Sequence, residues 1–555
     1  MHSPTQSKLS APTAAGQLSG YVTPLGAAPR SDRDSLRSAV ADICRPVYFV
    51  FQNGGYAVTH DASVQIGGGE PRPGALRLAG FSGPLLPEHL GDPTFCDDHG
   101  IRYAYMTGSM ANGIASVELV DAVARAGMLS FFGAAGKTVA QVTEAVERLK
   151  ASLGELPFGF NLIHSPHEPA TEAGVVELYL QSGIRLVEAS AYLDITLPVV
   201  RYRVHGIHRD AEGKVVAPCA IVAKASRIEV ATKWFSPPPE AMLARLVKSG
   251  DITAEQAELA QQIPLAQDLT AEADSGGHTD NRPALTMLPT FLALRDRLRR
   301  QYGYTMPLRV GAAGGIATPQ AAAAAFAMGA AYVVTGSINQ ACVESGSSDT
   351  VRKMLAEAQQ ADITMAPAAD MFEMGVKLQV LKRGTMFAMR AGKLFELYRQ
   401  CGSIDEIPAK DLQMLEKTVF RAPLAEIWDK TVRFFSERDP SQIERAERDG
   451  KHKMALIFRW YLGLSSRWAN LGEPTRQMDY QVWCGPAMGA FNEWVKGSSL
   501  ESPENRHVVS VAQNLLYGTA VATRVGHLRS QGIRLSDDVS RVVPIEPEQL
   551  EEYFH

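Results

Sequence analysis

The stretch from Glu272 to Asp280 places an ionisable ring beside two glycines, directly after an apolar, strand-like run. His278 titrates near neutral pH, so it could act as a general acid or as a polar partner for a reactive intermediate. Asp274 could orient the loop or the ring. A histidine that only caps backbone carbonyls is the alternative. The small residues that would let the backbone approach a ligand closely are Ser275, Gly276 and Gly277.

Two further glycine turns follow at the spacing of successive strand–helix units. Gly314 and Gly315 precede a helix expected over residues 318–328, and Gly336 with Ser337 opens the next unit. Glycine turns between a strand and a helix expose backbone N–H groups to an anion. Ordinary turns of this type are also rich in glycine, but two in succession favour a phosphate-bearing cofactor.

Other polar groups lie at the ends of expected strands. The loop that contains Met106, Gly108 and Asn112 offers flat backbone for a planar ring. Asn161 supplies both a donor and an acceptor, which suits the edge of a flavin pyrimidine. Lys224 could point into a barrel mouth and stabilise the anion of a reduced flavin. A turn or cap for Asn161 and an ammonium that reaches solvent for Lys224 are the alternatives.

The elements that must position these groups are short apolar strands, each followed by an amphipathic helix pattern. Eight such units predict an α/β fold, a (β/α)8 TIM barrel of about 250 residues, with its site at the C-terminal ends of the strands. The expected strands are 103–106, 129–132, 158–163, 186–188, 220–224, 268–271, 308–310 and 332–335.

The rest of the chain surrounds this barrel. We expect a mobile N-terminal segment at 1–45 and a small N-terminal subdomain at 46–100. The barrel at 101–362 should carry a helical insertion at 237–262. Beyond it, residues 363–545 should form a helical appendage, because the strand–helix rhythm stops there.

Composition excludes several classes of protein. The 55 basic and 60 acidic residues give a net charge of −5, which argues against nucleic acid as a partner. Six scattered cysteines without a Cys-x-x-Cys motif indicate a reduced compartment, no disulfide framework and no metal site. The start lacks a signal-peptide pattern, and the most apolar segment, 321–334, is too short to cross a membrane. We therefore expect a cytoplasmic protein with no membrane partner.

Three motifs together resemble the flavin-dependent barrels that include nitronate monooxygenases (the 2-nitropropane dioxygenase family) and flavin enoyl reductases. These motifs are Ser275-Gly-Gly-His278, Ala312-Ala-Gly-Gly-Ile316 and Gly336-Ser337. Within this group the chain more closely resembles one branch, the PfaD-type trans-acting enoyl reductases of polyunsaturated fatty acid and polyketide synthases. The resemblance runs from about residue 46 to about 545, and the strings that carry it lie at 272–283, 365–384, 453–470 and 483–492.

This resemblance implies FMN, NADPH as hydride donor, and an α,β-unsaturated thioester on an acyl carrier protein as substrate. We also expect a homo-oligomer, a dimer. His278 and Lys224 would be the catalytic residues. A nitronate-type monooxygenase and a non-catalytic synthase scaffold are the competing functions. The residues expected to bind the cofactor are Met106, Gly108, Asn112, Asn161, Lys224, Gly276, Gly277, Gly314, Gly315, Gly336 and Ser337.

Two further expectations concern the appendage. Apolar side chains there could line a tunnel for an acyl chain, although plain helix core is the alternative for each. A basic cluster could dock an acidic carrier, although the interleaved acidic residues favour a solvated helix face. The tunnel candidates are Met371, Phe372, Met374, Met386 and Phe387, and the basic cluster is Arg445, Arg448, Lys451 and Lys453.

Overall fold

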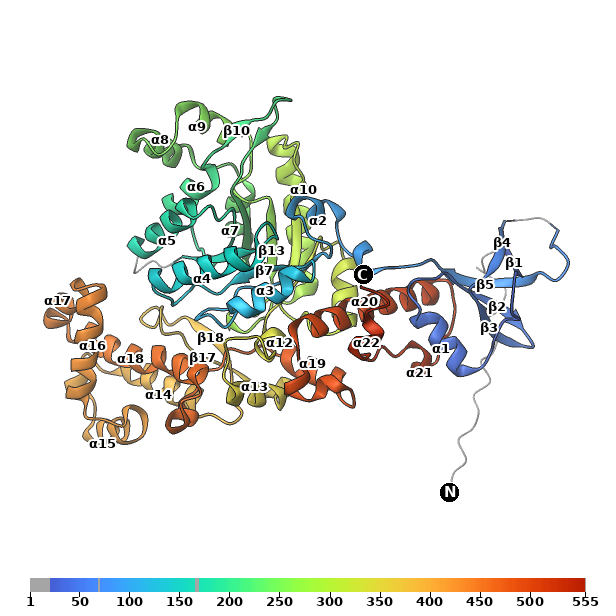
Figure 1. Cartoon of the computed structure of the whole chain (residues 1–555). Coiled ribbons are helices and arrows are strands. Elements are labelled where there is room, and N and C mark those ends of the chain that lie inside the picture. Colours follow the sequence, from blue (N-terminus) through green and yellow to red (C-terminus); the bar gives the residue numbers. More distant parts are fainter. Residues whose placement is uncertain (1–19, 68–69, 165–168, 555) are drawn as a thin grey trace, which may run out of the picture.

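Eight parallel strands close a barrel in the middle of the chain (Figure 1). The computed structural model describes residues 20–67, 70–164 and 169–554. The strands follow one another around the barrel in chain order, which confirms the predicted (β/α)8 barrel. They are β6 (Tyr105–Thr107), β7 (Leu129–Phe132), β8 (Gly159–Ile163), β9 (Leu186–Ser190), β12 (Ala220–Ala225), β13 (Asp268–Glu272), β15 (Arg309–Ala313) and β16 (Val333–Thr335).

Amphipathic helices surround the strands, and side chains that accept a backbone N–H mark where several of them begin. Ser116, Thr138 and Thr196 each do this at a helix start. Helices α8 (Glu240–Ser249) and α9 (Ala254–Ala260) occupy the expected insertion. The outer helices are α3 (Val117–Arg125), α4 (Val139–Leu153), α5 (Pro169–Gln181), α6 (Leu197–Val204), α7 (Ile228–Phe235), α10 (Ala284–Tyr302), α11 (Pro319–Ala327), α12 (Ser337–Gln340) and α13 (Asp349–Ala356).

Paired charges fill the end of the barrel where the strands begin. Arg309 is buried, and its Nε donates to Asp268 Oδ1 at 2.6 Å. The ring of His99, at the end of α2 (Pro93–His99), lies 2.8 Å from the other oxygen of Asp268. Because these charges neutralise one another in the core, this end of the barrel has a structural role. Groups that bind or react with a ligand are expected at the opposite end.

A five-stranded antiparallel sheet precedes the barrel. Its strands are β1 (Gly20–Pro24), β2 (Val47–Gln52), β3 (Gly55–Thr59), β4 (Ala62–Ile66) and β5 (Leu76–Ser82), in the order β3-β2-β5-β1-β4, and α1 (Arg33–Ala41) lies beside them. The expected mobile segment at 1–45 is therefore wrong for residues 20–45, while residues 1–19 lie outside the described part of the chain. The expected boundary at residue 100 also differs, because Phe95 of α2 stacks on Tyr332 of the barrel.

The region after residue 362 is not purely helical. Strands β17 (Ile363–Pro367) and β18 (Lys377–Leu381) form a hairpin that extends to β14 (Gly277–His278). The hairpin and the helices after it share a separate apolar core, and we call residues 363–480 the lobe. Its helices are α14 (Phe387–Gln400), α15 (Ala409–Met414), α16 (Leu424–Arg438), α17 (Ser441–Arg448) and α18 (Gly450–Leu471).

After the lobe, the chain returns to the barrel and continues to the N-terminal sheet (Figure 1, red). Helix α20 (Val508–Ser530) packs on α11 of the barrel and on β5 of the sheet. The buried guanidinium of Arg524 donates to the backbone carbonyls of Arg45 and Gly83. The expected single appendage at 363–545 is thus two units, the lobe and a C-terminal segment with α19 (Ala487–Val495), α20 and α21 (Asp537–Ser540). Helix α22 (Pro547–Leu550) follows beyond the expected range.

Three properties of the described residues bear on the class of protein. None of their helices is both long and apolar enough to cross a membrane. They hold no group of three or more His, Cys, Asp or Glu side chains placed to bind a metal ion. All six cysteines are free thiols.

Candidate active site

A cavity of 1630 Å³ lies between the C-terminal ends of the barrel strands and the lobe. Every residue expected to bind the cofactor lines it except Met106, which is fully buried in the barrel core. The prediction that Met106 binds the cofactor is therefore wrong. Its side chain points inward among Phe131 and Val334, because the loop begins only after β6 ends at Thr107. The structure thus brings the other predicted residues together from six different strand ends.

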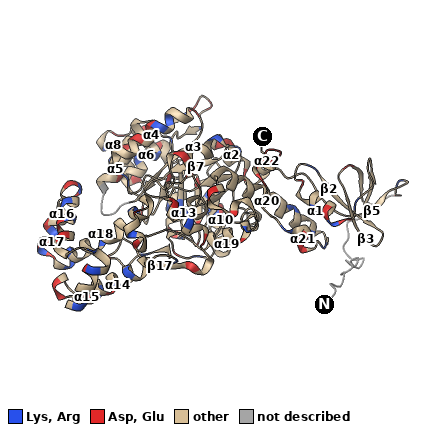
Figure 2. Ribbon diagram, turned by 60° about the horizontal axis from the view of Figure 1, so that its bottom comes forward, with Lys and Arg blue, Asp and Glu red and all other residues tan. Residues whose placement is uncertain are grey.

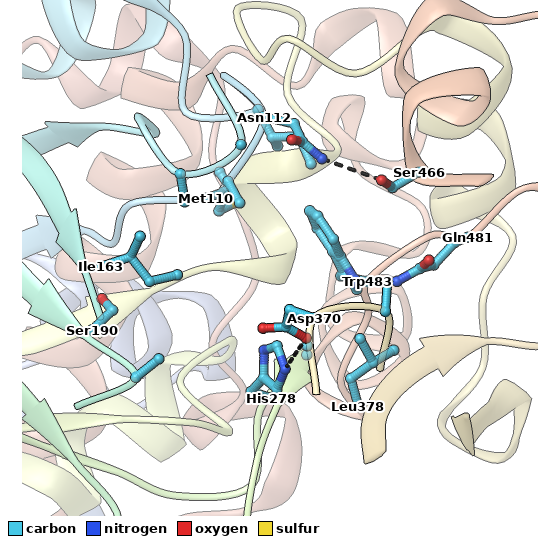
Figure 3. A pocket seen from close by; sticks show the side chains of 18 of the residues that line it. Met110, Asn112, Ile163, Ser190, His278, Asp370, Leu378, Ser466, Gln481 and Trp483 are labelled. Carbon is cyan, nitrogen blue, oxygen red and sulfur yellow. Dashed lines mark hydrogen bonds and ion pairs between the residues drawn. The ribbon is translucent and has the colours of Figure 1, made fainter. Parts of the chain in front are cut away.

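The His278 ring is held by a carboxylate from the lobe. Its Nε2 lies 3.1 Å from Asp370 Oδ1, as Figure 3 shows, and about a third of its side chain is exposed. Burial by itself would lower the pKa of His278, but the hydrogen bond and charge of Asp370 outweigh burial and raise it. The imidazolium form is thereby favoured, which suits a ring that donates a proton.

Asp274 does not orient the ring, contrary to one expectation. Its Oδ1 accepts from Asn281 Nδ2 at 2.8 Å and from Gln379 Nε2 at 3.0 Å. Gln379 also donates to the Ser275 carbonyl at 2.8 Å. Asp274 therefore fixes the glycine–histidine loop to β18.

Lys224 lies between two carboxylates on neighbouring strands. Its Nζ is 2.9 Å from Glu272 Oε1, and Glu188 is fully buried nearby. Burial disfavours the charge of Lys224, but Glu188 and Glu272 outweigh burial and raise its pKa. Burial also raises the pKa of Glu188, whose Oε2 accepts from Ser109 N at 2.8 Å. The ammonium stays charged, and two carboxylates offset much of its field.

The two glycine turns leave unused donors and open space. Gly315 has a φ of +79°, and no atom lies within 4 Å of where its Cβ would be; the same space is open at Gly336. Within the described chain, neither N–H donates to a backbone carbonyl. Ser337 Oγ accepts from Gly485 N at 3.1 Å, so its hydroxyl proton remains available. Such a cradle fits a phosphate group.

Gly314 and Gly276 face crowded backbone, whereas Gly315 and Gly336 face open space. A Cβ at Gly314 would lie 2.6 Å from the Ala273 carbonyl carbon, and one at Gly276 would lie 3.0 Å from the Cys484 backbone. Both glycines allow one backbone segment to pack on another. Gly314 joins the cradle loop to the loop that carries His278, and Gly276 joins the His278 loop to the segment at Cys484.

Asn161 has fewer free hydrogen-bonding groups for a ligand than the sequence predicted. Its Nδ2 donates to the Glu188 carbonyl at 3.1 Å and to Ser190 Oγ at 3.2 Å, so both amide hydrogens are committed. Only its carbonyl oxygen is left for a ligand. Asn112 has a positive φ of 59°, and its Nδ2 donates to Ser466 Oγ at 3.2 Å, which connects the first barrel loop to α18 (Figure 3).

Three residues at the site escaped the sequence interpretation. Asp370 lies inside the string at 365–384 that resembles the family, but nothing local marks it as the partner of a histidine 92 positions away. Glu188 ends an expected strand that lies next to the strand of Lys224. The position of these two strands side by side was the signal that could have identified Glu188 as a partner of Lys224. Trp483 borders the cavity beside Asp370 (Figure 3).

The tunnel candidates divide into four groups. Met371 lines the cavity. Phe372 and Phe387 are fully buried in the lobe core, and Met374 is exposed to solvent. Met386 forms the start of α14 and is not part of the cavity wall. Only Met371 therefore has the position that was expected of all five.

The basic cluster is also broken up. Lys451 Nζ donates to the carbonyls of Tyr398 and Cys401, and Lys453 lies over the ring of Trp428. Arg445 pairs with Asp449 at 3.7 Å. Both signs of charge alternate along α16 and α17 (Figure 2). The expected cluster is therefore not a uniform basic face, since two of its lysines anchor helices.

The fold and the site together define a barrel with a phosphate cradle and a carboxylate–histidine pair. The model of the nitronate monooxygenase family matches residues 94–391. This is more than half of the chain, which therefore belongs to the nitronate monooxygenase family. A second model, the inserted helical domain of [acyl-carrier-protein] S-malonyltransferase, matches residues 401–480 within the lobe.

Similar proteins confirm the resemblance to the PfaD-type branch. The chain is 50% identical over 454 residues to one of the polyunsaturated fatty acid synthase subunits of Thraustochytrium sp., covering 80% of this chain and 30% of that protein. It is 46% identical over 438 residues to polyketide biosynthesis protein PksE of Bacillus subtilis, covering 79% and 57% respectively. The chain thus spans less than two thirds of these relatives.

A solved structure is similar to most of the chain. It is the enoyl reductase domain of MlnA from the macrolactin biosynthesis cluster of Bacillus amyloliquefaciens. The TM-score is 0.76 at 40% identity, and the match covers 80% of this chain and 99% of that domain. Family membership implies a flavin cofactor, and the unused N–H donors of Gly315 and Gly336 fit its phosphate.

Proposed function

We propose that the chain is an FMN-dependent enoyl-[acyl carrier protein] reductase that acts in trans on thioesters of a polyketide or polyunsaturated fatty acid synthase, with NADPH as the hydride donor. The observation that carries this proposal is the match to 99% of the MlnA enoyl reductase domain at 40% identity. The cavity supports it, because a cradle for phosphate and a histidine whose pKa is raised face the same space.

Each residue of the site has a role in this proposal. Gly315, Gly336 and Ser337 would hold the FMN phosphate, and the oxygen of Asn161 would accept a hydrogen bond from the ring edge. A bound flavin supplies the hydride chemistry. His278, held by Asp370, donates a proton to the substrate α-carbon or a hydrogen bond to the thioester carbonyl. Lys224 binds Glu272 and offsets the buried carboxylate of Glu188.

Substitution of the histidine tests the proposal. The purified protein should be yellow, and denaturation should release FMN rather than FAD. We expect His278→Ala to retain FMN and to lose turnover of a carrier-bound crotonyl thioester by about 10²–10⁴-fold, the range for a positioned acid. Reduction of the flavin by NADPH should persist. The readouts are flavin absorbance and single-turnover kinetics.

Other outcomes would reject parts of this assignment. A preference for nitronates over enoyl thioesters would establish a monooxygenase. A colourless protein that cannot be reconstituted with FMN would favour a non-catalytic scaffold. Unchanged turnover in His278→Ala would assign the ring a structural role. We also propose a dimer, which light scattering of the purified chain tests directly.

A further inference from the structure

Two cations meet where the barrel loops touch the lobe. We propose that Lys137 and Arg467 bind the phosphate group of a reactant, as a subsite separate from the glycine cradle. Both residues line the cavity. The inference rests on the proposed function, because that function requires two phosphate-bearing reactants. These are a pantetheine arm attached through a phosphodiester and a nicotinamide dinucleotide phosphate.

Two contacts bring together the segments that carry these cations. A Cβ at Gly113, whose φ is +71°, would lie 2.8 Å from Lys137 Cε and 3.2 Å from its Nζ. The end of the Lys137 side chain therefore packs against the backbone of Gly113, and a side chain at this position would displace it. Asn112, next to Gly113 in the first barrel loop, donates to Ser466, and Arg467 is the residue after Ser466 (Figure 3). Lys137 from the barrel and Arg467 from α18 thus converge on one seam.

Neither cation has an acidic partner in the described part of the chain. Burial lowers the pKa of Lys137, and the charge of Arg467 lowers it further, so the two cations act on each other. An anion between them would relieve this repulsion. The acidic groups that line the cavity are all engaged elsewhere: Glu272 with Lys224, Asp280 with Arg227, Asp370 with His278, and Glu473 with Thr475.

The chemistry of the subsite favours phosphate. A guanidinium offers a planar pair of donors that matches a phosphate oxygen pair, and a lysine adds a point charge. Helix α4 begins beside Lys137 without an acidic residue in its first turn, so its dipole adds to the positive field.

The position of the subsite separates it from the cradle. Lys137 follows β7, whereas the cradle follows β15 and β16, and β6 lies between β16 and β7. At about 4.8 Å per strand, the two sites are on the order of 10 Å apart, which is too far for one phosphate group.

Binding measurements test the subsite without turnover. The probes are phosphopantetheine, pantetheine and NADP⁺, titrated by calorimetry into the flavin-loaded protein. We expect Lys137→Gln combined with Arg467→Gln to weaken one phosphate-bearing probe by about tenfold or more, the usual loss for charge-assisted hydrogen bonds. Pantetheine binding should not change. Lys430→Gln is the matched control, because this cavity-lining lysine already pairs with Glu426 at 2.6 Å.

The outcomes separate the two sources of phosphate. Weaker phosphopantetheine with unchanged NADP⁺ assigns the subsite to the carrier arm, and the reverse result assigns it to the dinucleotide. Equal loss on pantetheine, no loss on either phosphate probe, or loss of FMN from the double variant would overturn the proposal. A protein that binds phosphopantetheine through Lys137 but reduces no enoyl thioester would refute the proposed function and leave the subsite standing.

Discussion

At the scale of single residues, Asp370 determines how long His278 stays protonated as the pH rises. We expect Asp370→Asn to move the alkaline limb of the kcat–pH profile to lower pH. In the wild type the carboxylate raises the pKa of His278 despite burial, so the ring keeps its proton above its ordinary value near 6.5. Without that charge, burial lowers the pKa and a proton-donating step fails earlier. Profiles with coincident alkaline limbs would contradict this role.

Lys224 is the second residue whose charge can be tested. Lys224→Met leaves Glu188 and Glu272 facing each other, and we expect a loss of about 3–5 kcal/mol of unfolding free energy at pH 8. The folded pKa of Glu188 is already raised, so its ionisation destabilises the variant above pH 4.5. The loss should therefore shrink at pH 5. Thermal melting at both pH values, with flavin content as the control, measures it; equal losses would contradict the charge argument.

His278 and the glycine cradle could be recognised from sequence, whereas the partner of His278 could not. Asp274, four residues away, was a plausible partner for the ring, yet it binds Gln379. Asp370 reaches the ring because Gly277 pairs with Gln379 across β14 and β18. That register is a long-range contact, and no local pattern encodes it.

At the scale of elements, one buried carboxylate organises the lobe. Asp479 is inaccessible to solvent, and its oxygens accept from Tyr461 at 2.9 Å, from Arg421 at 3.2 Å and from Arg476 at 3.3 Å, with Arg390 also bound. We expect Asp479→Asn to cost about 3–5 kcal/mol, because the arginines lose their counter-ion. Limited proteolysis should cut the lobe first. Asp429→Asn, on the exposed face of α16, is the control; equal proteolysis of both variants would contradict this clamp.

Some whole elements could also be predicted from the sequence, and others could not. All eight barrel strands were predictable, because each is a short apolar run that ends in a glycine or polar turn and is buried on both faces. The hairpin of β17 and β18 was not predictable from the sequence, because its exposed and buried residues do not follow a repeating pattern along the strands. Strand β1 was hidden by a leading segment rich in small and polar residues.

At the scale of the whole molecule, α20 joins the barrel to the N-terminal sheet. A Cβ at Gly518 would lie 2.5 Å from Pro319 Cγ on α11 and 2.8 Å from Val542. We expect Gly518→Val to force the helices apart and to lower the unfolding free energy by about 1–3 kcal/mol. Gly526→Ala in the same helix meets no atom within 4 Å and should stabilise by about 0.5–1 kcal/mol. Melting temperatures that move the same way in both variants would refute this packing argument.

The bond from Arg524 to the Ala39 carbonyl spans 485 residues of sequence. A ribosome adds about 5–20 residues per second, so the nascent sheet waits on the order of a minute for the helix that covers its apolar face. During that interval Val40, Phe49 and Ala79 have no partner from α20, although all three are buried in the finished protein. The sheet translated before the barrel is therefore completed after it, and we expect it to be the part of the nascent chain that most needs a holding chaperone.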